Sequence, residues 1–295
     1  MATLPVEGAR KRAGPMSDDF NTADFNTVVD SRFGKMIVNR NDIYIGQAVM
    51  RYGEYSQHEF ALFEYLCGPG DIVVEVGANI GAHTLGLARH VGPGGRVVAV
   101  EPQPVVFQAL CGNMAINTIT NVDCLNLALS DAPGHVTIPI VDYGGQGNFG
   151  GISMQHAPDV ASRMPGHHVE ARRLDDVFDY PRLKLLKVDV EGMESAVLRG
   201  ATATIETHRP IVYIENDRID KSKALIECLF GYDYSLWWHL PPLFNEHNFN
   251  RVTENDYANF VSVNMLGVHN SVNTKIELQQ VEDSDFHPMR KAPAG

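Results

Sequence analysis

The chain has 295 residues, of which 44% are hydrophobic, and its formal net charge is -12 at pH 7. This length and composition are sufficient for a sizeable core, in one large domain or two small ones. The negative charge repels a phosphate backbone, and the one dense basic cluster is at residues 10–12, so we expect no nucleic-acid partner.

The four cysteines form no CxxC pair and each lies among apolar neighbours, a pattern of free thiols rather than of a zinc site or a disulfide framework. The N-terminal residues lack the apolar segment of a signal peptide. No apolar run approaches the roughly 18 residues that cross a bilayer. We therefore expect a cytoplasmic protein without a membrane span.

Residues 1–28 are small and polar, without periodicity, and predict a disordered tail. Short apolar runs then alternate with segments whose apolar residues have the spacing of a helix. Strands that alternate with helices indicate a mostly parallel, twisted sheet with helices on both faces. The predicted strands are residues 71–76, 96–101, 122–127, 184–189 and 209–215, and the predicted helices are residues 80–90, 104–117, 194–206 and 221–230.

Two segments depart from this alternation. Residues 134–174 hold an apolar run followed by several glycines, which predicts an inserted β-rich excursion with a mobile loop at residues 144–151. Residues 232–238 and 259–268 are strand candidates without an intervening helix, which predicts an antiparallel pair that closes the sheet. Residues 272–295 again predict a disordered tail. One domain is thus expected over residues 29–271, with a cofactor-binding core at about 60–215 and an acceptor-shaping part at about 216–271.

The junction between the first predicted strand and helix carries the strongest motif, Glu75-Val-Gly77-Ala-Asn79-Ile-Gly81. Glycines there tighten the turn and let the backbone approach a ligand. Asn79 occupies the place of the middle glycine that admits a dinucleotide pyrophosphate, which argues against NAD. Glu75 stands where it would receive the amino group of a methionine moiety, directly or through a water. This pattern is typical of S-adenosylmethionine (SAM) enzymes.

The second predicted strand ends in Glu101, which Pro102 follows. A carboxylate at this place suits a bidentate bond to ribose hydroxyls, which both nicotinamide cofactors and SAM present. Together with the glycine pattern, Glu101 favours SAM. The competing interpretation is a glycine turn that only packs a helix and binds no ligand.

Six segments together resemble the FkbM family of methyltransferases: residues 71–84, 100–104, 126–131, 174–176, 186–194 and 197–201. The resemblance covers about residues 60–215 and implies a Rossmann-like class I methyltransferase fold that binds SAM. It further implies that the glycine motif lines the methionine side, that Glu101 holds the ribose and that residues 128–131 flank the adenine. The expected cofactor contacts are Glu75, Gly77, Ala78, Asn79, Gly81, Glu101, Pro102, Ser130, Asp131 and Asp189.

The acceptor chemistry is assigned to Asp189, which ends the fourth predicted strand, and to Glu191. An alcohol is a weak acid, so a base or a cation near its oxygen assists transfer. The alternatives are a helix cap or loop anchor for Asp189 and helix-dipole stabilisation for Glu191. We assign no metal from the sequence, although magnesium is an option with Asp189, Glu215 and Asn216 as ligands.

Aromatic residues around His239 and His247 offer a platform for a sugar, although an ordinary aromatic core explains them as well. The resemblance implies O-methylation of a hydroxyl on a sugar, glycan or polyketide-like small molecule. N-methylation of an amide or amine is the alternative, and the Asn/Asp-Pro-Pro-Tyr/Phe element of many such enzymes is missing. A SAM-binding protein without catalysis is the third hypothesis.

Overall fold

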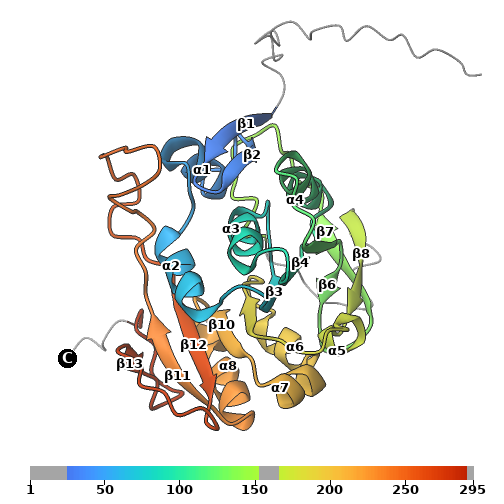
Figure 1. The fold of residues 1–295 in the computed structure, drawn as a ribbon, viewed down its shortest axis with the longest axis vertical. Helices are drawn as coiled ribbons and strands as arrows, with labels where there is room; N and C mark the ends of the chain where they lie inside the picture. The colour runs from blue at the N-terminus through green and yellow to red at the C-terminus, as the bar shows by residue number, and fades with distance from the viewer. Residues whose placement is uncertain (1–24, 153–165, 291–295) are drawn as a thin grey trace, which may run out of the picture.

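The computed structural model describes residues 25–152 and 166–290 (Figure 1). Its centre is an eight-stranded sheet in the order β13-β11-β12-β10-β9-β3-β4-β5. The strands from β5 to β10 are parallel, whereas β12 pairs antiparallel with both β10 and β11. The predicted Rossmann-like sheet and its antiparallel C-terminal pair are thereby confirmed. The strands are β3 (Ile72–Val76), β4 (Arg96–Val100), β5 (Val122–Leu125), β9 (Leu185–Val188), β10 (Ile211–Glu215), β11 (Tyr234–His239), β12 (Asn264–His269) and β13 (Gln279–Gln280).

Both faces of the sheet are covered because the central strands are apolar on both sides. Val73 and Leu185 point to the face that α2 and α3 cover, while Val74 and Leu186 point to the face of α6, α7 and α8. The described helices are α1 (Ile45–Tyr52), α2 (Gln57–Leu66), α3 (Ala82–Val91), α4 (Pro104–Ile116), α5 (Leu174–Val177), α6 (Glu194–Arg199), α7 (Thr202–His208) and α8 (Ile219–Gly231).

The single helix predicted over residues 194–206 is instead two helices, α6 and α7. They are separated at Gly200 and Ala201. A Cβ atom on Gly200 would lie 2.0 Å from the backbone oxygen of Ser130, so the chain needs a glycine at this contact. The periodicity of the apolar residues continues across the break, and sequence spacing alone does not reveal it.

Two smaller sheets flank the central one. The hairpin of β1 (Asn26–Ser31) and β2 (Gly34–Asn39) packs against α1 and α4. The predicted β-rich insertion forms a three-stranded sheet in the order β6-β8-β7. Its strands are β6 (Ala128–Leu129), β7 (Gly134–Pro139) and β8 (Gly166–Arg172).

Both predicted tails differ from the structure. Strand β1 begins at Asn26, inside the expected N-terminal tail, whereas residues 1–24 lie outside the described part. At the other end, β13 pairs with β11, and Val281 and His287 are buried. The expectation of disorder from residue 272 is therefore wrong up to residue 290. Short polar segments such as this one gain order from long-range pairing that local composition does not reveal. Among the described residues, no helix has the length and apolar character needed to cross a bilayer.

Candidate functional site

A cavity of about 270 Å³ opens at the carboxyl ends of β3, β4, β9 and β10. This is the edge of an open α/β sheet at which ligands bind, and the volume is near the lower end of the ~300–1,000 Å³ of small-molecule sites. The structure brings most of the predicted cofactor contacts together here. Those that line the cavity are Glu75, Gly77, Ala78, Asn79, Glu101, Pro102 and Asp189.

The turn from β3 to α3 shapes the floor of the cavity. Gly77 has φ 83° and Asn79 has φ 51°, both in the left-handed region. A Cβ atom on Gly77 would lie 1.8 Å from the backbone oxygen of Asp189, so only glycine fits between the two strand ends. Gly81, which was predicted to contact the cofactor, lies outside the cavity lining. It begins α3 with φ 84° and faces Leu110, so its role is in packing.

Glu101 is buried, with 3% of its surface exposed, and its carboxylate borders the cavity. Its Oε2 accepts a hydrogen bond from the Asn79 amide at 2.9 Å, and its Oε1 accepts one from the Gln103 amide at 2.8 Å. Burial raises the pKa of Glu101 to about 7, although the two amide bonds lower it in part. Each carboxylate oxygen retains acceptor capacity for a further donor, such as a ribose hydroxyl.

Lys187 is a site residue that the sequence analysis missed. Its side chain is 4% exposed, and its Nζ lies 3.3 Å from Asp189 Oδ2 and 3.8 Å from Glu75 Oε1. Burial alone would lower the pKa of Lys187, but Asp189, Glu75 and Glu59 together hold it above its ordinary value. Lys187 is therefore charged. The sequence does indicate this position, because Lys187 stands two residues before Asp189, and side chains at i and i+2 lie on the same face of one strand.

Ser130 and Asp131, predicted beside the adenine, do not line the cavity. Asp131 pairs with Arg199 at 2.8 Å, and the side chain of Ser130 is buried next to it. Gln103, Asn148 and residues 150–152 line the cavity instead.

The glycine loop predicted to be mobile is held in place by hydrogen bonds. Gln103 Nε2 donates to the Phe149 oxygen at 2.8 Å. The Gly147 amide donates to the Asn41 oxygen at 3.0 Å, and the Ile43 amide donates to the Gly147 oxygen at 3.1 Å. The insertion thus reaches across to the segment after β2 and closes one side of the cavity.

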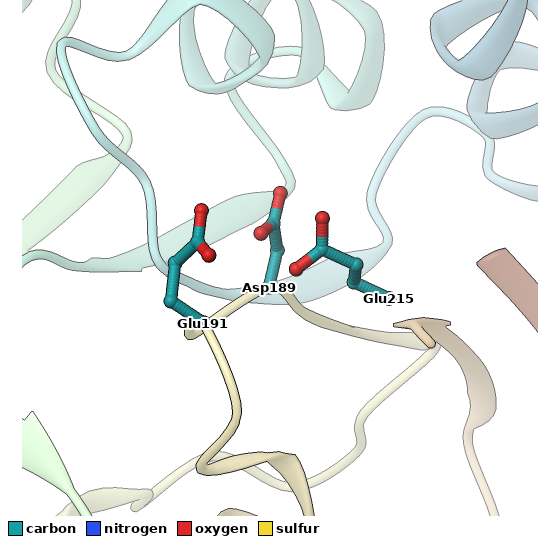
Figure 2. A group of neighbouring side chains, drawn as sticks. All are labelled: Asp189, Glu191 and Glu215. Carbon is teal, nitrogen blue, oxygen red and sulfur yellow. The ribbon is translucent and has the colours of Figure 1, made fainter. Parts of the chain in front are cut away.

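Three carboxylates, those of Asp189, Glu191 and Glu215, also line the cavity and lie next to one another (Figure 2). Each offers an oxygen within 4.8 Å of the other two. Burial, and then the charge of Asp189, raises the pKa of Glu191 to about 7 despite its ion pair with Arg218. The same two causes raise the pKa of Glu215 well above its ordinary value.

Asn216, which was considered beside Asp189 and Glu215 as a magnesium ligand, is turned away from this group. Its amide nitrogen donates to Ser222 Oγ at 2.9 Å, and its side chain is buried. The structure places Glu191 in the acidic group instead. Because Glu191 has φ 54° and Gly192 has φ 99°, the chain turns back on itself directly after β9.

The aromatic platform expected near His239 and His247 is not part of the cavity. Trp238 is 2% exposed and packs against the ring of His287, so it belongs to the core. His239 hydrogen-bonds with the Tyr213 hydroxyl, and the His247 side chain is 86% exposed. The rings that do line the cavity are those of Tyr44, Tyr55, His83 and Phe260, and burial lowers the pKa of His83 to about 4.

The comparisons with known proteins agree with the FkbM resemblance. Residues 75–249 match the family model described as the methyltransferase FkbM domain. The 31-O-demethyl-FK506 methyltransferase FkbM of Streptomyces tacrolimicus is 30% identical over 203 residues, which are 60% of this chain and 77% of that protein. Methyltransferase sdnD of Sordaria araneosa is 32% identical over 156 residues, or 43% of this chain.

A further relative is the hexuronic acid methyltransferase AglP of Haloferax volcanii, 31% identical over 147 residues, or 46% of this chain. The match spans 59% of sdnD and 52% of AglP, so the chain covers less than two thirds of these two relatives. The family model, in contrast, matches more than half of the chain, from the glycine motif of β3 to beyond β11. The chain therefore belongs to the FkbM family of methyltransferases.

Proposed function

We propose that the protein transfers a methyl group from SAM to a hydroxyl of a sugar, glycan or polyketide-like small molecule. The observation that carries the proposal is the buried carboxylate of Glu101, fixed by two backbone amides at the end of β4 and facing the cavity. A carboxylate placed in this way accepts hydrogen bonds from the two hydroxyls of a ribose.

The other residues of the cavity also fit SAM. Glu75 and Asp189 border the space with negative charge, which Lys187 offsets only in part and to which Glu101 adds when ionised, and such a field favours a cationic ligand. The close approach of Gly77 to the end of β9 places the glycine turn and Asp189 next to each other in the lining of the cavity. When bound, SAM supplies a methyl group that its sulfonium has already activated.

Asp189 is proposed to orient the acceptor and to share the proton of its hydroxyl. The side chain of Asp189 is 40% exposed at the cavity, and the Lys187 ammonium lies 3.3 Å from one of its carboxylate oxygens. As the acceptor oxygen bonds to the methyl carbon, the bond from carbon to sulfur breaks and its electron pair stays on sulfur. The hydroxyl proton then leaves the acceptor for a carboxylate of the site.

The acceptor class rests on the relatives and on the shape of the wall. One relative is named for 31-O-demethyl-FK506 and another for hexuronic acid. In this chain, Tyr44, Tyr55 and Phe260 line the cavity, and rings of this kind pack against the faces of sugars and other cyclic compounds.

Isothermal titration calorimetry with SAM, S-adenosylhomocysteine and NAD tests the cofactor. The first two are expected to bind, and NAD only poorly. Release of S-adenosylhomocysteine is then measured with a panel of neutral sugars, hexuronic acids and macrolide alcohols, with amines as the comparison. Tight NAD binding without SAM binding would refute the proposal, and turnover of amines alone would replace the acceptor class.

We also propose that the acceptor is not a nucleic acid, since the chain carries a net charge of -12 and its cavity is acidic. A cytoplasmic location is proposed on the four cysteines, Cys67, Cys111, Cys124 and Cys228, all of which are free thiols.

A further inference from the structure

The acidic group of Asp189, Glu191 and Glu215 owes its compactness to the topology of the sheet. Strands β9 and β10 are parallel neighbours with Val188 opposite Ile214, so Asp189 and Glu215 follow side by side. The left-handed turn at Glu191 brings a third carboxylate back to the same place. Figure 2 shows the three carboxylates next to one another, rising from adjacent strand ends in the same general direction.

Glu215 contributes a second and independent observation. Its Oε2 is buried, and no hydrogen-bond donor reaches that atom anywhere in the described part of the chain. The two neighbouring acids have basic partners, since Asp189 contacts Lys187 and Glu191 contacts Arg218. A buried polar oxygen without a donor is rare in proteins and calls for an explanation such as an ion that the chain itself does not supply.

We propose that Asp189, Glu191 and Glu215 form a binding site for a divalent cation of the Mg²⁺ or Mn²⁺ type. All three ligands are carboxylate oxygens, which these hard cations prefer. Their oxygens lie within 4.8 Å of one another, close enough to contact a single ion. The cation would satisfy Glu215 Oε2 and relieve the repulsion among three carboxylates.

The proposed ion deepens the proposed function, and this part of the inference rests on it. Three carboxylates fill about three of the six positions of an octahedral ion and leave the others to water or a ligand. These positions border the same cavity as Glu101 and Tyr55. With the ion bound, Asp189 acts as its ligand in place of sharing the proton, and the acceptor hydroxyl is expected to bind the ion, which lowers the pKa of the hydroxyl.

The test is direct binding of Mn²⁺ to the full-length protein after treatment with EDTA and gel filtration. Calorimetry and the loss of the free Mn²⁺ signal in electron paramagnetic resonance are expected to show one saturable site, which Mg²⁺ competes for. Glu215→Gln keeps the shape of the side chain and is expected to weaken Mn²⁺ binding by about tenfold or more. Glu206→Gln, the same change at an exposed position on α7, is the matched control and leaves binding intact.

Thermal unfolding provides a readout that does not depend on activity. Mn²⁺ is expected to raise the Tm of the wild-type protein and of Glu206→Gln, but not that of Glu215→Gln. If Glu215→Gln does not fold, Asp189→Asn takes its place. Absence of saturable Mn²⁺ binding, or equal binding by wild type and Glu215→Gln, overturns the proposal. SAM binding in the metal-free protein is measured in parallel, and its loss would count against the proposed function rather than against the ion.

Discussion

The buried Lys187 contacts the half-exposed Asp189 at the end of β9, where the Lys187 Nζ lies 3.3 Å from Asp189 Oδ2. The same ammonium lies 3.8 Å from Glu75 Oε1, and Glu75 in turn accepts a hydrogen bond from Thr84 Oγ1 at 2.6 Å. One buried cation therefore joins the strand that carries the glycine motif to the carboxylate proposed to face the acceptor.

Replacement of Lys187 by Met is expected to destabilise the protein by about 3–5 kcal/mol. The methionine fills the space of the lysine, but it leaves Glu75 and Asp189 without their buried counter-charge, and breaking one partner of such a group has this cost. The free energy of unfolding from urea titration of wild type and Lys187→Met measures the loss.

The double variant Glu75→Gln/Lys187→Met tests whether the lost stability comes from the uncompensated charge or from the packing of the side chain at position 187. Part of the lost stability is expected to return, because the glutamine removes one of the uncompensated carboxylates and still faces Thr84. A double variant whose loss is the sum of the two single losses would show that Lys187 and Glu75 are not coupled.

Glu101→Ala is expected to weaken SAM binding by roughly 2–4 kcal/mol, since two hydrogen bonds to a charged acceptor are lost. Calorimetry measures the dissociation constant, and circular dichroism checks the fold. Asp131→Asn is the control, because Asp131 pairs with Arg199 away from the cavity and its loss should leave SAM affinity unchanged. An unchanged affinity in well-folded Glu101→Ala would place the ribose elsewhere.

The pKa of Glu101, about 7, predicts the pH dependence of cofactor binding. Above pH 7 the carboxylate is ionised and accepts the ribose hydroxyls. Below pH 7 the unliganded protein must release a proton to bind, so the affinity for SAM falls by up to about tenfold per pH unit. Dissociation constants between pH 5.5 and 8.5 are expected to show this decline toward acid, and Glu101→Gln should flatten it. Tighter binding in acid would contradict the assignment.

The raised pKa of Glu101 affects the stability of the unliganded protein in the opposite direction, because acid favours the folded state. The folded-state pKa of Glu101 lies above its ordinary value of 4.5, so the protonated form is favoured on folding. Its contribution to stability is present in full below about pH 4.5 and is lost as the pH rises through about 7. In the Glu101→Gln variant this part of the pH dependence is expected to disappear from urea titrations.

Gly77→Ala and Gly92→Ala separate crowding from backbone strain. Both glycines have positive φ, 83° and 66°, and Gly92 also has ψ -175°, in a region confined largely to glycine, so alanine at either position costs about 1–3 kcal/mol. At Gly92 nothing lies within 4 Å of an added Cβ, whereas at Gly77 the Asp189 oxygen lies 1.8 Å away. Gly77→Ala is therefore expected to lose clearly more stability than Gly92→Ala and also its SAM affinity. Equal losses in urea titration would show that the two strand ends move apart readily.

Asp189→Asn is expected to keep the fold and most of the SAM affinity but to slow methyl transfer by about 100-fold or more. Asparagine retains the shape of the side chain, but it neither accepts the proton nor binds a cation well. Single-turnover formation of S-adenosylhomocysteine measures the rate, and calorimetry measures SAM affinity. Full activity of Asp189→Asn on the true acceptor would shift the chemistry to Glu191.

The parts of the site that follow from local rules were predictable from the sequence. Gly77 and Glu101 each stand at the end of an apolar run, and parallel strands bring such ends to one edge of the sheet. Asp189 follows from the same argument. Lys187 was overlooked because an isolated lysine in an apolar run gives no indication of which buried acids will surround it.

Long-range packing decided the features that the sequence did not reveal. Asp131 belongs to a segment that resembles the family motif beside the cofactor. Its pairing with Arg199 nevertheless holds it at the surface, outside the cavity lining. Glu191, and not Asn216, joins Asp189 and Glu215 in the acidic group, because a left-handed turn redirects the chain after β9. The order of residues 276–290 depends on pairing with β11, more than 35 residues earlier.

The C-terminal strand β13 affects whether copies of the protein associate through the edge of the sheet. It pairs at Trp237 and Trp238 and covers one edge of β11, a strand whose side chains are largely apolar. An uncovered strand of this kind is a template for pairing with other chains, whereas a two-residue edge offers almost nothing to extend. Residues 276–290 are therefore expected to protect the sheet from aggregation, and a protein shortened at residue 272 would keep the proposed catalytic groups but present the six-residue edge of β11 to its neighbours.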